Sequence, residues 1–358
     1  MQRIGVIGGG LAGLAVAFRR LAKGDEIVLL ESAGRLGGQL WTERTSGFVV
    51  EHGAEGFVAR SEAVPALATA LGIGDDLIGQ SETRSYGYDG TGLRALAPGE
   101  AATFLGFQVP KEELGKGIRT FRRGMAQLAE ALGVAIADRA DVRRDARVAT
   151  IDPIANRWRI TLAGGAAEDV DAVVVATGAV AAARILEGAF GEAARALLAA
   201  KTASSVTVTL AYARDAIAHP LDATGFVVAE GHQEHGLRAS TFITSKFPDR
   251  APTDHVSLRL FFRPTSDDLA ALDDAAWTAR AEAGLARVLP VSGRPLHAWV
   301  SRWADALPVF EPRHVEHVKA LEAALAGSGV ILSGSAFHGS GIDAAVRSAE
   351  SASRALDA

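Results

Sequence analysis

The N-terminal segment, residues 1–31, constrains the fold more than any other part of the chain. Two apolar runs, Arg3 to Ile7 (RIGVI) and Glu26 to Leu30 (EIVLL), predict buried strands. Between them the turn GGGLAG, residues 8–13, precedes a helical pattern from Leu14 to Leu21, and Glu31 follows the second strand directly. Strand, glycine turn, helix, strand and terminal acid in this order predict a βαβ unit that binds a dinucleotide, and therefore an α/β fold.

The residues of the turn have separate mechanical roles in G-x-G-x-x-G. Gly8 permits the tight turn, Gly10 lets backbone N–H groups approach a pyrophosphate, and Gly13 lets helix and strand pack closely. Leu11 and Ala12 are further candidates for the cofactor site, because they lie just before the helix that the pattern predicts from Leu14. We expect its N–H groups to bind phosphate, because a helix N-terminus carries partial positive charge.

Glu31 and the segment after it distinguish between the possible cofactors. An acid at this place accepts hydrogen bonds from a ribose, which favours FAD or NAD over NADP. The segment Arg35-Leu36-Gly37-Gly38 resembles the R-x-G-G segment that follows the ribose acid in the amine oxidase superfamily of flavoproteins. The resemblance implies FAD, with Arg35 as a cation for phosphate charge and Gly37 and Gly38 leaving space for the cofactor.

The next landmarks resemble the protoporphyrinogen oxidase family within that superfamily. The family has an acid, a Gly-Pro pair and a phenylalanine, which match Glu51, Gly53-Ala54 and Phe57. A Leu-Gly-x-Gly-Asp turn follows at residues 71–75, and a hairpin follows at Tyr86 to Gly99. Ala54 stands where the family usually has proline. The resemblance places Gly53, Ala54 and Glu55 at the cofactor.

The C-terminal half continues the resemblance. Phe121 to Leu132 is similar to the glycine-methionine helix start of the family, and Trp303 to Phe310 is similar to its W-x-x-A-L-P segment near the flavin. Val330 to Ala345 is similar to the closing strand, turn and helix. The resemblance implies a backbone contact to adenine and a helix N-terminus at the flavin, and it adds these cofactor residues: Val148, Trp303, Gly334, Ser335, Gly341 and Ile342.

These patterns predict an α/β protein with a Rossmann-like FAD-binding domain of the amine oxidase type and a mixed-sheet substrate domain. We expect the FAD-binding domain to be discontinuous, formed by residues 1–80, 124–200 and 325–358. The substrate domain would then take residues 81–123 and 201–324. Alternating runs at residues 203–211, 225–228 and 257–262 predict strands in it.

One block of the family is missing. Protoporphyrinogen oxidases carry a large helical domain between the hairpin and the glycine-methionine segment, which forms much of the substrate pocket. Here only Glu100 to Arg123 lies between these landmarks, and Lys111 to Lys116 is too charged to enter lipid. We therefore expect an FAD site that is retained and a flavin face that is more open, or covered by a partner subunit of a homo-oligomer.

Composition excludes several other classes. The formal net charge is −5, so no excess of positive charge indicates nucleic acid or an anionic membrane. The absence of cysteine excludes disulfides, thiolate metal sites and a cysteinyl–flavin bond. Ala172 to Ala183 is the longest nearly apolar stretch, well short of the roughly 20 residues of a membrane helix. We expect a cytoplasmic protein.

His232/His235 and His314/His317 form H-x-x-H pairs. Because no third ligand stands at a recognisable spacing, we expect loop or helix-surface histidines and no metal.

The resemblance implies an FAD-dependent oxidase that takes a hydride from a small reduced substrate of tetrapyrrole type, with dioxygen or another acceptor reoxidising the flavin. Two alternatives stay open. One is a small amine-oxidase or renalase-like flavoprotein that acts on an amine or a reduced nicotinamide. The other is a non-catalytic flavin- or porphyrin-binding protein. No catalytic side chain is assigned; His338, in the closing turn, is a weak candidate for a base, and is as well explained by a structural role.

Overall fold

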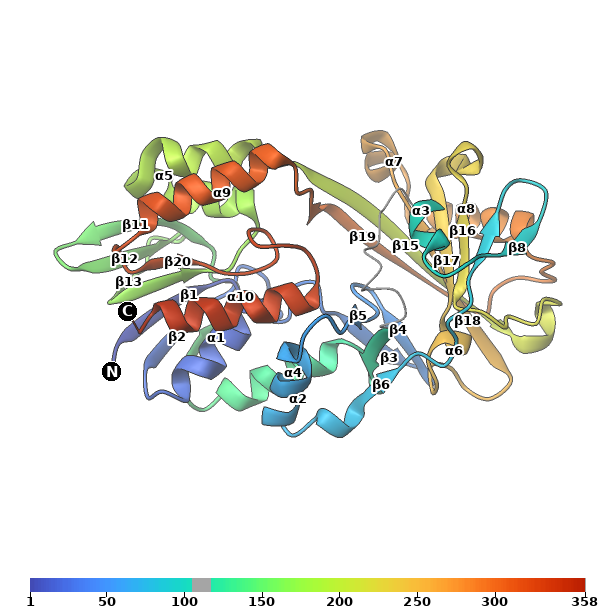
Figure 1. Ribbon diagram of the computed structural model, residues 1–358, viewed down its shortest axis with the longest axis horizontal. Coiled ribbons are helices and arrows are strands. Elements are labelled where there is room, and N and C mark those ends of the chain that lie inside the picture. The colour runs from blue at the N-terminus through green and yellow to red at the C-terminus, as the bar shows by residue number, and fades with distance from the viewer. Residues whose placement is uncertain (105–116, 358) are drawn as a thin grey trace.

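The computed structural model describes residues 1–104 and 117–357. Figure 1 shows two halves, one built on a parallel sheet and one on a larger mixed sheet, joined by the long strands β15 (Thr202–Ala213) and β19 (His297–Pro308). Both chain ends lie in the first half, away from the junction. The segment from Lys111 to Lys116, too charged to enter lipid by its sequence, lies outside the described residues.

The first half contains a five-stranded parallel sheet in the order β10-β2-β1-β14-β20. The predicted strands Arg3–Ile7 and Glu26–Leu30 are confirmed at both ends. The strands are β1 (Arg3–Ile7), β2 (Glu26–Leu30), β10 (Asp141–Arg143), β14 (Ala172–Val175) and β20 (Val330–Leu332). They are nearly continuous apolar runs because both faces of a parallel sheet are buried.

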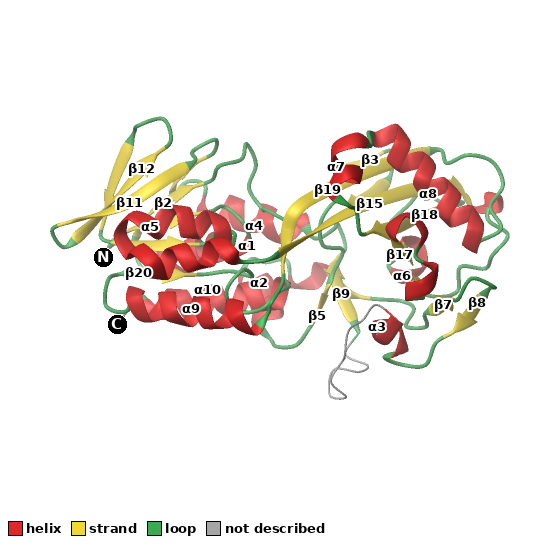
Figure 2. Ribbon diagram, turned by 90° about the horizontal axis from the view of Figure 1, so that it is seen from above, coloured by secondary structure: helices red, strands yellow, loops and turns green. Residues whose placement is uncertain are grey.

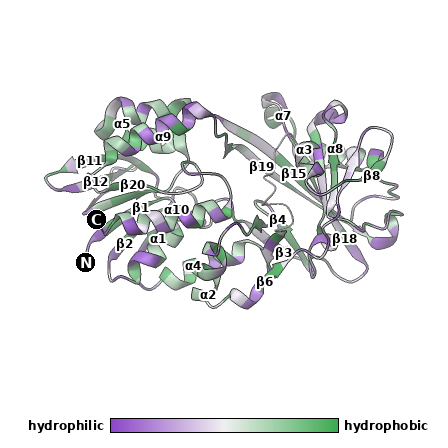
Figure 3. Cartoon of the chain, viewed as in Figure 1, coloured by the Kyte–Doolittle hydropathy of each residue, from purple (hydrophilic) through white to green (hydrophobic). Residues whose placement is uncertain are grey.

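Successive side chains of these strands enter two different hydrophobic cores. Val174 belongs to the core that also holds helices α1, α2, α4 and α10. Val173 and Val175 belong to the core with α5, α9 and a three-stranded antiparallel sheet. Figure 1 shows α5 and α9 on one side of the parallel sheet and α1 and α10 on the other. In Figure 3, α9 and α10 carry both hydrophobic and hydrophilic colours, as helices with one buried side do. The first covering layer consists of α1 (Leu11–Leu21), α2 (Ala63–Ala70), α4 (Ala126–Ile136) and α10 (Ile342–Ala355). The second consists of α5 (Ala179–Arg195), α9 (Pro312–Leu325), β11 (Val148–Ile154), β12 (Arg157–Leu162) and β13 (Ala167–Val170).

The second half is built on a seven-stranded mixed sheet in the order β19-β15-β18-β17-β16-β7-β8. The β16–β7 pair is parallel and the other pairs are antiparallel. The strands are β7 (Tyr86–Tyr88), β8 (Leu93–Ala95), β15 (Thr202–Ala213), β16 (Gly225–Val228), β17 (Leu237–Phe242), β18 (His255–Phe262) and β19 (His297–Pro308).

The two faces of this sheet differ in character. Val206, Val208 and Leu210 of β15 share a core with Trp277 of α8 (Asp274–Val288), beside which lies the short α7 (Ser266–Ala271). The alternate residues face the other way, and because opposed residues of paired strands share a face, Thr207, Arg259 and Thr241 lie together there. We call this second side the polar face.

Short elements fill the space between the halves. A hairpin and a small three-stranded sheet lie there, and Figure 2 shows β15 and β19 running past them from one half to the other. These elements are β3 (Thr42–Thr45), β4 (Phe48–Glu51), β5 (Phe57–Val58), β6 (Leu77–Gly79) and β9 (Ile118–Phe121). Two short helices, α3 (Glu100–Phe104) and α6 (Ile243–Lys246), instead contact strands of the seven-stranded sheet.

Packing suggests where the two domains divide. We propose the division expected from the sequence with two changes. Val318 and Leu321 of α9 belong to a core of the first half, so residues from 312 onward join the FAD-binding domain. Strand β9 pairs with β5 and β6, so it groups with residues 1–80 rather than with the substrate domain.

Within the described residues, no helix is both long and apolar enough to cross a membrane.

Candidate functional site

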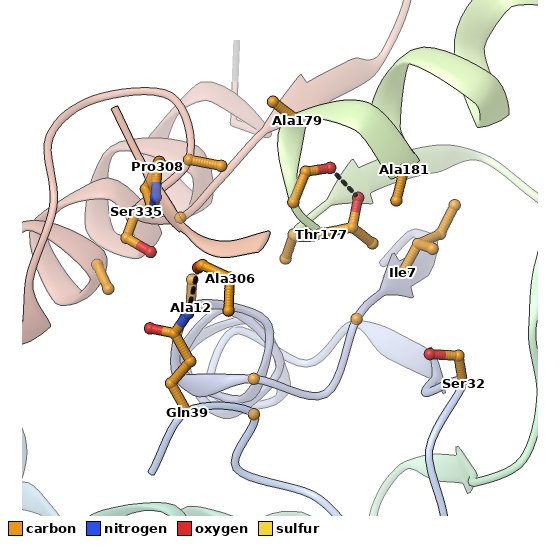
Figure 4. Close-up of a pocket in the computed structure, with 18 of the residues that line it drawn as sticks. Ile7, Ala12, Ser32, Gln39, Thr177, Ala179, Ala181, Ala306, Pro308 and Ser335 are labelled. Atoms are coloured by element: carbon orange, nitrogen blue, oxygen red, sulfur yellow. Dashed lines mark hydrogen bonds between the residues drawn. The ribbon is translucent and has the colours of Figure 1, made fainter. Parts of the chain in front are cut away.

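A cavity of about 670 Å³, the first cavity, opens at the carboxyl ends of the parallel strands. Ligands of open α/β sheets bind at this edge. Its wall comes from segments distant in sequence, which Figure 4 shows converging: Ser32 lies on one side, and Gln39, Ala306 and Ser335 lie on the other.

The glycine turn before α1 presents backbone to this cavity. A Cβ on Gly13 would lie 1.9 Å from the carbonyl oxygen of Gly8, so helix and strand could not pack this closely around a side chain. A Cβ on Gly10 would meet only the Cα of Gly38, at 4.0 Å, and Gly10 lines the cavity. Helix α1 has neither a side-chain cap nor an acidic residue in its first turn, which leaves its first N–H groups for a ligand.

Glu31 lines the cavity where β2 ends. Its Oε2 accepts a hydrogen bond from the Gly9 N–H at 2.7 Å, and its Oε1 accepts one from the Ala33 N–H at 2.7 Å. These bonds fix the carboxylate beside the glycine turn. The Ser32 hydroxyl also donates to Oε1, at 3.2 Å, so Oε2 is the oxygen that keeps a further lone pair for a ligand hydroxyl.

The second glycine pair closes over the first. The Gly37 N–H donates to the Gly9 carbonyl at 2.8 Å, and a Cβ on Gly38 would lie 3.1 Å from the Cα of Gly10. The Arg35 guanidinium donates to the carbonyl of Gly38 at 2.5 Å and lies over the Trp41 ring. Arg35 is outside the cavity lining and holds the backbone of this loop.

The closing turn lies between β20 and α10. Helix α10 begins at Ile342, as predicted, with Gly341 as its N-cap at φ 99°. It also lacks a side-chain cap hydrogen bond, and Gly334, Ser335, Gly341 and Ile342 all line the cavity. Two helix N-termini therefore meet one cavity, each with unsatisfied N–H donors.

The structure brings most of the residues predicted from the sequence to this wall. Those that line the first cavity are Gly8, Gly10, Leu11, Ala12, Glu31, Gly37, Gly38, Ala54, Val148, Gly334, Ser335, Gly341 and Ile342. Those outside its lining are Gly13, Arg35, Gly53, Glu55, Trp303 and His338. Some of the second group support the wall from behind: the Trp303 Nε1–H, for example, donates to the His52 carbonyl at 2.6 Å.

His338 is half-exposed and bonds away from the cavity. Its Nδ1 lies 3.1 Å from the Ser348 Oγ, which accepts a hydrogen bond from the Gly334 N–H, and its Nε2 lies 2.6 Å from a Glu322 oxygen. Among the described contacts, these two side chains are its hydrogen-bond partners. The ring therefore links α9 and α10 through the closing turn.

Sequence reasoning missed several residues of the wall. Gln39 donates through Nε2 to the Ala306 carbonyl at 2.7 Å, a contact between the glycine loop and β19 that Figure 4 marks with a dashed line. His314 was expected on a helix surface or in a loop, and this is wrong: it is buried, lines the cavity and lies 2.8 Å from the Ala336 carbonyl. Its position four residues before Val318, on the inner side of α9, was the available signal.

A second cavity, of about 330 Å³, lies against the polar face of the seven-stranded sheet. Its wall includes Ser205 of β15, Phe261 of β18, Thr241 of β17 and Lys246 of α6. Ala54 lines the first cavity, and the next residue, Glu55, accepts hydrogen bonds from Thr241 and Lys246 of the second. The Ala54–Glu55 step therefore links a wall residue of the first cavity to wall residues of the second.

A buried group of charges stands behind the second cavity, and we call it the charge cluster: Glu51, Glu55, Lys246, Arg250 and Arg259. Burial opposes ionisation of Glu55, but Lys246 and Arg259 hold the pKa of this carboxyl below its usual range. Burial raises the pKa of Glu51, although Thr42 and the Met125 N–H donate hydrogen bonds to it.

With this geometry in place, comparison with known proteins identifies the family. Residues 11–112 and 90–357 match the profile described as flavin containing amine oxidoreductase, which together cover most of the chain. The chain belongs to this family. It is an FAD-dependent oxidoreductase, which takes electrons from a small-molecule substrate and passes them to an acceptor.

Curated relatives of this flavin oxidoreductase extend over almost all of the chain. The coproporphyrinogen III oxidase of Mycobacterium tuberculosis strain H37Rv is 28% identical over 99% of this chain and 98% of its own length. That of Propionibacterium freudenreichii is 25% identical over 99% of this chain and 90% of its own length. The alignments extend over 451 and 489 positions. Because this chain has 358 residues, the relatives carry residues without a counterpart here.

Solved structures show the same fold in other flavoproteins. A "putative protoporphyrinogen oxidase" from an Exiguobacterium species superposes with a TM-score of 0.84 at 22% identity, over 99% of this chain and 98% of the other. Putrescine oxidase bound to putrescine superposes with a TM-score of 0.75 at 14% identity, over 99% of both chains.

The first cavity fits FAD. It has glycine backbone where a phosphate must approach closely, two helix N-termini without side-chain caps, and a carboxylate at the end of the second strand. Its volume lies within the ordinary range of cofactor and ligand sites.

Proposed function

We propose that this flavoprotein oxidises a porphyrinogen, a reduced tetrapyrrole, and that its second cavity receives part of that substrate. The observation that carries the proposal is the link between the walls of the two cavities through the Ala54–Glu55 step, whose carboxylate binds Thr241 and Lys246. A substrate held against the polar face of the sheet would lie beside the cofactor. The curated names of the relatives, coproporphyrinogen III oxidases, supply the substrate class.

FAD would lie along the first cavity with its adenosine at Glu31 and its flavin at the start of α10. Glu31 would bind the adenosine ribose, with Val148 near the adenine. The N-terminus of α1, at Leu11 and Ala12, would bind the pyrophosphate between the two glycine loops. Ile342 at the start of α10 would face the flavin, where the helix dipole stabilises negative charge.

FAD, when bound, supplies the hydride acceptor, and dioxygen or another acceptor takes its electrons. The chain's own residues position the substrate and shape the cavity. In the described structure, the weak base candidate His338 lies outside the cavity lining, so we assign it no proton transfer. Positioning of the substrate against the cofactor is the main contribution we propose for the protein.

Anaerobic mixing tests the function directly. The purified protein is mixed with coproporphyrinogen or protoporphyrinogen while the visible flavin absorbance is followed, and porphyrin fluorescence is read after air is admitted. We expect rapid bleaching and catalytic porphyrin formation. Amines and dihydronicotinamides are the comparison reductants. Bleaching by these and not by porphyrinogens would replace our proposal with the amine-oxidase or renalase-like alternative, and no bleaching at all would favour a binding protein.

A further inference from the structure

The second cavity has cations and hydroxyl groups on its wall beside apolar residues such as Phe226 and Phe261. Hydroxyl groups of Ser85, Ser205 and Thr224 lie on its wall with Arg238 and the buried Lys246. The Thr224 hydroxyl donates to the Arg84 carbonyl at 2.9 Å, and the Ser85 hydroxyl, 2.9 Å away, therefore donates to Thr224, so the cations carry more of the proposal than these two hydroxyls do. Walls with hydroxyls and cations are typical of sites that bind a carboxylate.

Arg238 reaches this cavity through an irregularity in the sheet. The register between β17 and β18 shifts between Leu237 and Ala239, so Arg238 is the extra residue of a bulge. A bulge turns a side chain away from the alternation of its strand, and bulges often lie next to active sites. A second register shift, between Ala203 and Ser205 of β15, adjoins the same wall.

The charge around the cavity is positive overall. In the charge cluster the basic groups Lys246, Arg250 and Arg259 outnumber the acidic groups Glu51 and Glu55. Arg238 adds a further positive charge, and both Arg263 and the acidic Glu230 are close enough to interact with it electrostatically. An anionic group entering the cavity would therefore be attracted, and an ammonium group would be repelled.

We propose that the second cavity is a carboxylate subsite in which Arg238 and Lys246 hold a propionate side chain of the substrate. The inference rests on the proposed function for the identity of the carboxylate. With a volume of about 330 Å³ the cavity takes a propionate-bearing ring edge rather than a whole macrocycle. The rest of the tetrapyrrole then extends toward the Ala54–Glu55 step and the cofactor.

The subsite makes the chain selective for acidic tetrapyrroles. Coproporphyrinogen carries a propionate on every pyrrole ring, whereas protoporphyrinogen has vinyl groups in place of some of them. More orientations of coproporphyrinogen can place a carboxylate in the cavity, so we expect it to be the better substrate of the two. The positive wall also disfavours a protonated amine as substrate.

Binding measurements separate this inference from the proposed function. The probes are coproporphyrin III and its methyl ester, which lacks the charges, titrated into the holoenzyme and followed by fluorescence. In the wild type we expect the acid to bind at least about tenfold more tightly than the ester, a difference of about 1.4 kcal/mol. Arg238→Gln should remove most of that difference, and Arg238→Lys should restore part of it because the charge returns without the planar fork.

Arg294→Gln is the matched control, since it removes the same charge from a side chain that is almost fully exposed and lies outside the second cavity lining. We expect its affinity for coproporphyrin to stay within about twofold of wild type. Equal binding of acid and ester, or an unchanged affinity in Arg238→Gln, would overturn the subsite. Because Lys246 is paired with buried Glu55, Lys246→Gln is used only after its fold has been checked by circular dichroism.

Benzoate and benzyl alcohol, compared by calorimetry, decide the case in which porphyrins do not bind. Benzoate binding that depends on Arg238, without porphyrinogen oxidation, would keep the carboxylate subsite and reject the porphyrinogen as substrate. Porphyrinogen oxidation that is insensitive to Arg238→Gln, without benzoate binding, would keep the function and reject the subsite.

Discussion

At the scale of single residues, the second and third glycines of the first motif, Gly10 and Gly13, limit the chain in different ways. Gly13 touches the protein itself, because a Cβ there would lie 1.9 Å from the Gly8 carbonyl oxygen. Gly10 touches little protein, since its Cβ would meet only Gly38, at 4.0 Å, and it lines the cavity. One glycine is therefore needed for folding and the other for binding.

Substitution by alanine should separate these two requirements. Gly13→Ala should destabilise the protein by about 1–3 kcal/mol or more, as overpacked sites do. Gly10→Ala should leave the stability of the cofactor-free protein within about 0.5 kcal/mol and weaken FAD binding at least about tenfold. Urea unfolding of the apoprotein and FAD titration measure the two quantities. A Gly10→Ala protein that binds FAD normally would show that the turn does not approach the cofactor.

Sequence reasoning succeeded for these residues because the glycine pattern is local. It failed for Arg238 and Lys246, which line a cavity only after β17 pairs with β18 and α6 packs beside them. A bulge that re-aims Arg238 leaves no mark in hydrophobic alternation. The role of Arg35 at the cofactor stays a prediction: its guanidinium binds the Gly38 carbonyl and lies outside the cavity lining.

At the scale of elements, the closing turn depends on a chain of hydrogen bonds between helices. Glu322 of α9, His338 of the turn and Ser348 of α10 are joined in sequence, and Ser348 accepts from the Gly334 N–H. This series of hydrogen bonds fixes the backbone of the closing turn, which lines the cavity, while the His338 side chain itself lies outside the lining. His338 is therefore a positioning residue.

Replacement of His338 distinguishes this role from general base catalysis. His338→Ala should cost about 1 kcal/mol of stability or less, because its bonds are partly exposed, and should lower the flavin reduction rate by less than about threefold. Loss of a general base would lower the rate by about 10²–10⁴ and change its pH profile. Glu322→Gln, at the other end of the same chain, should behave like His338→Ala. Stopped-flow flavin bleaching across pH measures both variants.

Several elements were predictable because their signals lie within a few residues. The strand Gly225–Val228 has the bounds predicted from the sequence, and α10 begins at Ile342, as predicted. Contacts between distant segments were not predictable in this way. Strand β9 pairs with β5 and β6, and α9 packs on α5, through surfaces that periodicity alone does not assign to a partner.

At the scale of the whole molecule, the first cavity is assembled from parts of the chain that are far apart. The glycine turn, the β14 end at Thr177 and the closing turn each contribute, together with Ala306 at the end of β19. Gln39 and Ala306 already join the glycine loop to the long strand that leads into the second half. A cofactor in this cavity would contact all of these segments at once.

Cofactor removal should therefore weaken the whole fold. A ligand that binds only the native state stabilises it by about 2.7 kcal/mol at a free concentration 100-fold above Kd. We expect FAD to raise the melting temperature of the apoprotein by several degrees, with a shift that grows with the logarithm of FAD concentration. FMN, which lacks the adenosine that Glu31 would bind, should give a smaller shift, and so should NAD, which has that adenosine and a pyrophosphate but no flavin. Equal shifts with FMN and FAD would mean that the Glu31 side of the cavity does not hold the cofactor, and the orientation along the cavity would then be wrong. Gly10→Ala should reduce the FAD shift without changing the melting temperature of the apoprotein, because that substitution affects the cavity and not the packing of the two halves.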